Sequence, residues 1–310
     1  MRAPAAAFLA ILAGVSLATT ARAQTGTDPA FPGPVPQARL ATASPTAETP
    51  AAAPRDLRLA NSLVVGGGIA GVAAYGLAKW WEDGFTGSFG TEDEGWFGQD
   101  TPYGGADKAG HAYAGYFGVR VVSALLQSYD NDRRTAGDLA FWATLGTLTA
   151  VEVADGFSKQ YKFSGQDALM NVAGTAFAWW CERDPAIDDL LDFRLYYRQS
   201  AESDGWDAFG DYAGQRYLLV LKASGVPALR DKPVLRYLEF AVGYGARGYD
   251  SPPEVPRERS VYVGLQLNLA ALLNDTAFRD GRWPAARRAS EVFFDLWQVP
   301  GTAVYAKTTL

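Results

Sequence analysis

The sequence predicts an α+β fold in which a four-helix bundle, expected to associate with a membrane, is followed by a small antiparallel β region. Four long apolar stretches of helical length occupy the first part of the chain after its N-terminal segments. From about Phe193 the pattern changes to short runs rich in Tyr, Val and Leu, separated by Gly, Pro and Asp. We therefore assign the bundle to residues 55–190 and the β-rich region to residues 191–310.

The N-terminal segment has the features of an export signal. Met1 and Arg2 give a basic start, an apolar run follows, and Ala21-Arg22-Ala23 is a small-residue cleavage site. A retained anchor helix is the alternative, but the apolar run is short for a membrane span. We expect residues 1–23 to be a signal peptide and the Ala/Pro/Thr-rich residues 24–54 to be a disordered tether.

Charge and cysteine content exclude several classes of protein. Cleavage would remove Arg2 and Arg22, so the formal charge of −6 would become −8. A chain this acidic has no electrostatic footprint for nucleic acid. Cys181 is the only cysteine, so the fold is expected to stand without an internal disulfide, and no cysteine follows the signal to carry a lipid anchor.

The expected helices run over residues 59–78, 110–127, 138–155 and 166–180. Only the first is long enough, without a charge, to span a bilayer, and the others carry polar groups such as Arg120 and Asn171. Against this, tryptophan pairs stand at helix ends, where an aromatic belt would place them. Gly67 and Gly71 also form a small-residue packing face. We therefore expect the bundle to be embedded in a membrane.

The β-rich region is expected to contain strands at residues 215–221, 235–249 and 260–269. Each run is rich in β-branched and aromatic residues and is bounded by turn formers. Residues 251–259 are rich in proline and charge, which favours a hairpin loop between the last two strands.

The first helix contains a glycine pattern that resembles a dinucleotide-binding motif. Gly66, Gly68 and Gly71 match G-x-G-x-x-G, as in flavin-dependent oxidoreductases. The motif requires a second strand ending in an acidic residue, but the chain continues as Lys79-Trp80-Trp81-Glu82-Asp83. We therefore expect helix packing by these glycines and no binding of flavin or NAD.

Ionisable and amide residues recur at helical spacing on three of the expected helices. Asp107 and His111 are four residues apart with Lys108 between them, and His111 is the only histidine in the chain. Two further helices repeat spacings of three or four, and Gly174 completes the last of them. The candidate site residues are Asp107, Lys108, His111, Glu152, Asp155, Asp167 and Asn171.

Two interpretations of this polar set are open. In the first, Lys108 neutralises a carboxylate from another helix, with Asp167 favoured over Glu152, and the set only stabilises the bundle. In the second, His111 and a carboxylate act as acid and base, or bind a divalent cation, on a substrate that enters from the lipid side. A two-histidine zinc site is excluded within a monomer.

Four segments of the chain resemble the YfiM-like family of predicted periplasmic lipoproteins of unknown function. They are residues 94–97, Gly105-Ala106-Asp107-Lys108-Ala109-Gly110-His111, residues 152–157 and residues 164–174. Residues 211–215 and 243–248 also resemble the C-terminal part of that family. The order D-K-x-x-H, then a glutamate, then D-x-x-x-N-x-x-G is similar to VanZ-like membrane proteins, which implies four membrane-associated helices. Neither resemblance implies a reaction.

The sequence therefore predicts an exported, periplasm-facing membrane protein of the cell envelope. Its polar site is expected to act on or bind a membrane lipid or a lipid-linked envelope component. No organic cofactor is expected, whereas a divalent cation is compatible with the site. The alternative is a non-catalytic structural or binding protein in which the same residues stabilise the bundle.

Overall fold

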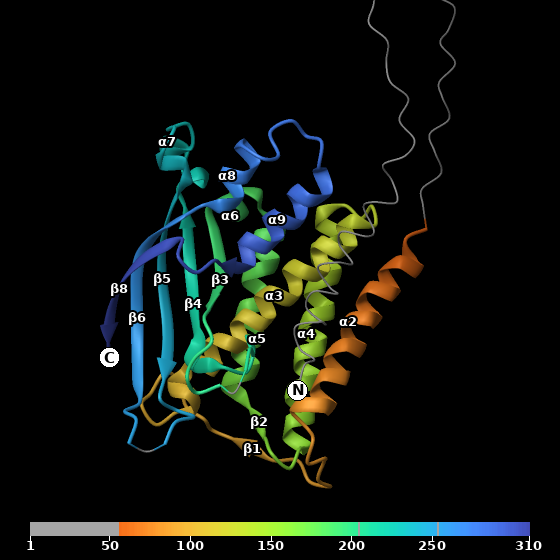
Figure 1. Cartoon of the computed structure of the whole chain (residues 1–310). Helices are drawn as coiled ribbons and strands as arrows, with labels where there is room; N and C mark the ends of the chain where they lie inside the picture. The colour runs from red at the N-terminus through yellow and green to blue at the C-terminus, as the bar shows by residue number, and fades with distance from the viewer. Residues whose placement is uncertain (1–55, 204, 253) are drawn as a thin grey trace, which may run out of the picture.

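The computed structural model describes residues 56–310 except residues 204 and 253. The expected signal peptide and tether lie outside these residues. Four long helices lie on one side of the molecule and a six-stranded sheet on the other, with α9 at the junction (Figure 1). The long helices are α2 (Arg58–Lys79), α3 (Ala106–Ser128), α4 (Arg133–Phe157) and α5 (Gly165–Arg183), and the shorter ones are α6 (Pro185–Leu190), α7 (Pro227–Arg230), α8 (Leu269–Asp275) and α9 (Pro284–Leu296).

The four expected bundle helices are all present, each a little longer than the apolar stretch that predicted it. Polar caps explain two of the starts. The Asp132 side chain accepts a hydrogen bond from the backbone of Thr135 at the start of α4, and Ser164 does the same for Asp167 at the start of α5. Helix boundaries therefore follow capping chemistry that lies outside the apolar runs.

Helix α2 lies at the outer edge of the molecule. It is the one helix among the described residues that is long and apolar enough to cross a membrane, and only 6% of its apolar window is buried. The expectation that its glycines pack against a helix is wrong for the described part of the chain. A Cβ atom added at Gly67 or Gly71 would meet nothing within 4 Å, because α2 turns this face outward. The helix also runs unbroken through Gly66, Gly68 and Gly71, so the strand–turn–helix context of a dinucleotide site is absent there.

Helices α3 and α5 approach each other very closely. A Cβ atom added at Gly174 would lie 1.7 Å from the backbone oxygen of Ala112. Such a separation is shorter than any nonbonded contact, so only glycine allows this approach. The glycine of the D-x-x-x-N-x-x-G pattern therefore sets the distance between the two helices that carry most of the polar residues.

The sheet has the strand order β7-β3-β4-β5-β6-β8 and is antiparallel except for the β3–β7 pair. The strands are β3 (Leu191–Tyr197), β4 (Gln215–Lys222), β5 (Leu238–Arg247), β6 (Glu258–Leu267), β7 (Trp297–Gln298) and β8 (Ala303–Thr309). A separate parallel pair joins β1 (Thr91–Glu92) to β2 (Phe163–Ser164). Short 3₁₀ helices complete the elements: η1 (Pro102–Gly105), η2 (Tyr212–Gly214), η3 (Ala223–Gly225) and η4 (Leu235–Tyr237).

The two faces of the sheet have different environments. One face packs through Leu195 and Tyr217 against Tyr113 of α3. On the opposite face Arg194 is buried and pairs with Asp192 and Glu239. The register puts the buried apolar residues Leu218 and Val220 on this second face too, so its interior combines ion pairs with an apolar cluster, whereas the first face packs on α3.

The strand half shares its core with the helical half. Val292 and Leu296 of α9 belong to the same buried cluster as Tyr116 of α3, and the Tyr113 hydroxyl donates to the Leu296 backbone oxygen at 2.8 Å. The three expected strands correspond to β4, β5 and β6, with shifted ends. Strand β8 and the helix α9, which follow them in the chain, were not expected from the sequence.

Candidate functional site

The start of α3 is fixed by an unusual backbone turn. Tyr103, Gly104 and Gly105 all have positive φ angles, of 45°, 62° and 85°. At Gly105 a Cβ atom would also lie 2.7 Å from the backbone of Phe97. Glycine is therefore required there by both conformation and space. The turn ends the 3₁₀ helix η1 and begins α3 at Ala106, so Asp107 and Lys108 lie in its first turn.

Two further helix ends and a loop meet at this point. Glu152 and Asp155 lie in the last turns of α4, while Asp167 and Asn171 lie in the first turns of α5. The β1–β2 pair places Glu92 opposite Ser164, which precedes α5. This pairing brings the loop that carries Glu94 to the start of α3 and α5.

Lys108 is completely buried and is surrounded by three carboxylates. Its Nζ atom lies 2.8 Å from Asp107 Oδ2 and 2.8 Å from Asp167 Oδ1, and it also donates to Glu94. The expected partner Asp167 therefore contacts Lys108, whereas Glu152 does not. Buried charges of this kind persist only when they are paired.

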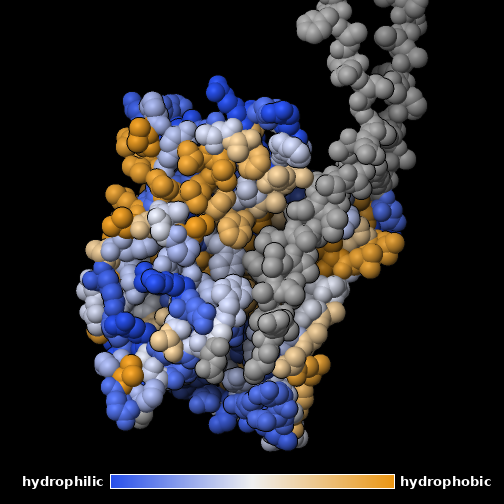
Figure 2. All heavy atoms as spheres, viewed as in Figure 1, coloured by the Kyte–Doolittle hydropathy of each residue, from blue (hydrophilic) through white to orange (hydrophobic). Residues whose placement is uncertain are grey.

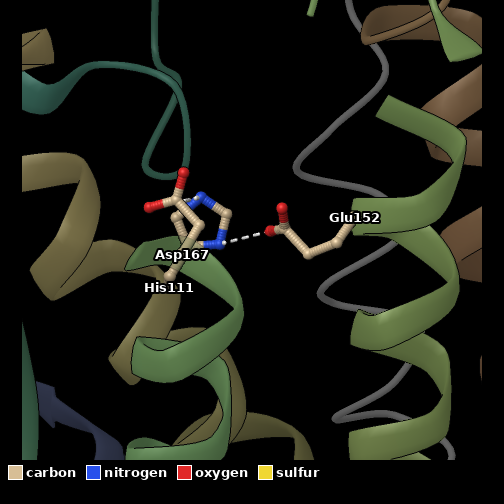
Figure 3. A group of neighbouring side chains, drawn as sticks. All are labelled: His111, Glu152 and Asp167. Atoms are coloured by element: carbon tan, nitrogen blue, oxygen red, sulfur yellow. Dashed lines mark ion pairs between the residues drawn. The ribbon is translucent and has the colours of Figure 1, made fainter. Parts of the chain in front are cut away.

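His111 forms the second part of the cluster (Figure 3). Its Nδ1 atom lies 3.4 Å from Glu152 Oε1 and 3.3 Å from Asn171 Oδ1, and its Nε2 atom lies 3.7 Å from Asp167 Oδ1. Asn171 in turn donates to Glu152 at 3.2 Å. The His111 side chain is 28% exposed, but that of Glu152 only 3%. The imidazole is therefore the part of this group that a ligand can reach.

Asp155 lies at the edge of the site and has a different partner. Trp81, just beyond the end of α2, donates its indole N–H to Asp155 Oδ1 at 2.6 Å. Trp81 is itself buried, so its place is inside the protein and not in an aromatic belt. It ties the end of α2 to the end of α4.

Burial changes the acidity of the site strongly. It raises the pKa of Glu152 to about 7. The pKa of Glu94 is also raised to about 7, mainly by burial and to a smaller extent by the hydrogen bond to Asp167. Burial also raises the pKa of Asp107. At Asp167 burial acts in the same direction, but electrostatic interaction with His111 and hydrogen bonds at the carboxylate lower the pKa overall.

The arrangement could also hold a divalent cation. One ligand atom from each of His111, Glu152 and Asp167 lies within 4.8 Å of the others, and the same is true of Glu94, Asp107 and Asp167. Oxygen and imidazole ligands of this kind suit several divalent metals. Lys108 contacts all three carboxylates of the second group but only Asp167 of the first, so the first is the better candidate.

The structure brings all seven sequence-derived candidates to one region, and it adds Glu94 and Trp81. The sequence offered a weak signal for Glu94, which stands in a segment of the family resemblance but has no helical spacing. A tryptophan at a helix end is typical of a membrane interface, so the position of Trp81 in the sequence gives no signal for a place in the site.

Part of the chain matches a described protein family. Residues 93–182 match the family described as "Predicted periplasmic lipoprotein (DUF2279)". The match supports an exported, periplasmic protein of the cell envelope, and it covers every site residue except Trp81. It does not extend to the YfiM-like or VanZ-like similarity or to the C-terminal segments. No curated protein and no solved structure matches the chain.

Proposed function

We propose that this chain is an exported envelope protein, held at a membrane through α2, that binds or acts on a lipid or lipid-linked component at the His111–Glu152 pair. The observation that carries the proposal is the contact between an accessible imidazole and a buried carboxyl group whose pKa is raised to about 7. A group that titrates near neutral pH can both accept and donate a proton under the conditions of the periplasm.

The geometry around this pair favours proton transfer. Asn171 donates to Glu152 and also contacts the His111 ring, so it orients both groups. The Nε2 atom of His111 lies 3.7 Å from Asp167, beyond hydrogen-bond distance, which leaves this nitrogen available to a ligand. A proton could then pass between the ligand and the imidazole, with Glu152 as the buried partner at the other ring nitrogen.

The surface of the helical half supports an apolar partner. Val153 and Phe157 of α4 and Leu169 of α5 are exposed apolar side chains next to the polar residues of the site. Helix α2 has 22 residues, about 33 Å at 1.5 Å per residue, and this length fits the hydrocarbon core of a bilayer. Figure 2 shows hydrophobic residues along the outer edge of α2. These features support a lipid or lipid-linked ligand over a small soluble one.

A structural role is the second candidate, and the Lys108 group favours it. Lys108 is fully buried among three carboxylates and has no exposed surface with which to contact a ligand. We therefore assign stabilisation to Lys108 and its partners, and ligand chemistry to His111 and Glu152.

Two substitutions separate these roles. Each variant is expressed in cells that lack the protein. The His111→Gln protein should have the abundance and thermal stability of the wild type, but it should not restore the wild-type envelope phenotype or lipid profile. The Lys108→Met protein should be less abundant and should also fail to restore the wild-type phenotype. Lys159→Gln, an exposed change beyond the end of α4, is the matched control and should behave as wild type. Full complementation by His111→Gln would contradict the proposed function.

A further inference from the structure

A hollow of about 400 Å³ lies on the face of the sheet that is turned away from α3. We call it the sheet groove, and its lining includes Tyr196, Arg216, Tyr262, Tyr305 and Lys307. A second hollow shares four of these residues and extends the groove toward Arg198, Arg247 and Glu258. The groove lies on the strand half, outside the site formed by α3, α4 and α5.

The strand register builds the groove from two pairs, each made of a ring and a cation. Tyr196 on β3 stands directly opposite Arg216 on β4, and Tyr262 on β6 stands opposite Lys307 on β8. The Arg216 guanidinium lies over both rings, 4.7 Å from the centre of Tyr196 and 4.4 Å from that of Tyr262. Contacts of this kind restrict the movement of the guanidinium plane.

The strand between the two pairs leaves room for the hollow. Gly245 on β5 lines the groove, and a Cβ atom at this position would come within 3.5 Å of Arg216 and 3.6 Å of Tyr262. A larger side chain would therefore fill the space where the two pairs meet.

Arg216 differs from the buried arginines Arg194 and Arg120 in having no anionic partner in the part of the chain that the structure describes. Arg194 pairs with two carboxylates, and Arg120 pairs with Glu182, Asp188 and Asp295. Among the described residues, none offers the Arg216 guanidinium a carboxylate or a hydrogen-bond acceptor, and its contacts are the two tyrosine rings.

The charge of the groove is strongly positive in an acidic chain. Its lining contains four cationic side chains and one carboxylate, Glu258, which already binds both Arg247 and Lys307. The other two cations, Arg198 and Arg216, have no ion-pair partner among the described residues. The whole chain has a formal charge of −6, so this concentration of positive charge is a local feature.

We propose that the sheet groove binds a phosphate group through Arg216, with Lys307 as the second cation. A guanidinium held in a fixed plane matches the oxygen geometry of phosphate, whose several oxygens can accept from Arg216 and from a second cation at the same time. Inorganic phosphate and the headgroup of an anionic phospholipid both present this chemistry. The proposal does not depend on the function assigned to the His111–Glu152 pair.

Two binding measurements on the purified full-length mature protein test the groove. Inorganic phosphate is titrated by isothermal calorimetry, and flotation is measured with vesicles of phosphatidylcholine alone or with phosphatidylglycerol added. Acetate serves as the carboxylate control for the titration. Arg216→Gln should weaken phosphate or phosphatidylglycerol binding roughly tenfold or more, since a charge-assisted hydrogen bond is lost.

Two further variants keep the result interpretable. Arg282→Gln removes an exposed arginine that pairs with Asp280 elsewhere, and it should bind as wild type. Lys307→Gln should weaken binding in the same direction as Arg216→Gln, so the test does not rest on the folding of one variant. Binding of phosphate alone identifies a free anion as the source, and dependence on phosphatidylglycerol identifies a headgroup. The proposal is overturned if the wild type binds neither probe, if it binds acetate as tightly, or if folded Arg216→Gln and Lys307→Gln proteins bind both probes within twofold of wild type.

Discussion

The Nζ atom of Lys108 lies 2.8 Å from Asp167 Oδ1, and this contact joins the first turn of α3 to the first turn of α5. Asp107 and Glu94 complete the surroundings of the ammonium group. Their combined effect raises the pKa of Lys108 although burial acts in the opposite direction. Lys108 is therefore charged, buried and satisfied by residues from a helix, a second helix and a loop.

Lys108→Met should destabilise the protein by about 3–5 kcal/mol, because it leaves buried carboxylates without their cation. Adding Asp167→Asn should recover part of this loss, and the coupling free energy between the two substitutions should be about 0.5–3 kcal/mol. Adding Glu152→Gln should give nearly additive effects, since Glu152 contacts His111 and not Lys108. The measurement is a pair of double-mutant cycles on urea unfolding in detergent. Additive effects of Lys108→Met and Asp167→Asn would contradict the ion pair between Lys108 and Asp167. A stronger coupling between Lys108 and Glu152 would contradict it as well.

Glu152 should make stability depend on pH between about 4.5 and 7. Its pKa is raised in the folded protein, so the folded state holds this proton more tightly than the unfolded state does. The contribution of this proton to the free energy of unfolding is fully present below about pH 4.5, falls as the pH rises, and is lost above about pH 7. A rise in the pKa of Glu152 from 4.5 to about 7 corresponds to about 3 kcal/mol in the free energy of unfolding.

The variant Glu152→Gln removes this titration. Urea unfolding at pH 5 and pH 8 should show a smaller difference between the two conditions for Glu152→Gln than for the wild type. Glu254→Gln, in the exposed loop between β5 and β6, provides the control and should keep the wild-type difference. An unchanged pH dependence in Glu152→Gln would mean that this carboxyl group titrates at its ordinary value.

Gly174→Ala should destabilise the protein by about 3 kcal/mol or more, because its methyl group would overlap the backbone oxygen of Ala112. The two helices would have to separate, and this would move Asn171 and Asp167 away from His111 and Lys108. Gly165→Ala on the same helix has open space at its Cβ position and should be neutral or slightly stabilising. Thermal unfolding of both variants makes the comparison, and equal melting temperatures would contradict the close approach.

The helical half was more predictable than the strand half. Apolar stretches of helical length located α2, α3, α4 and α5 because helical periodicity is a local property of the chain. The strand half was only partly predicted. Helix α9 packs Val292 and Leu296 onto α3. This packing depends on a helix far away in the sequence, so no local pattern predicts it. The glycine face of α2 was misjudged for the same reason, since spacing alone does not say whether a neighbour is present.

Helical geometry alone places Asp107, Lys108 and His111 in one region of α3, because residues up to four apart on a helix are neighbours, and this could be predicted from the sequence. The sequence also predicts that acids recur at the ends of α4 and α5. Which acid contacts which base follows from the packing of the helices and could not be predicted from the sequence. Lys108 takes Glu94 from a loop and Asp167 from α5, while Glu152 meets His111. These pairings depend on distances between helices, which are set by contacts such as Gly174 against Ala112, and no local pattern encodes them.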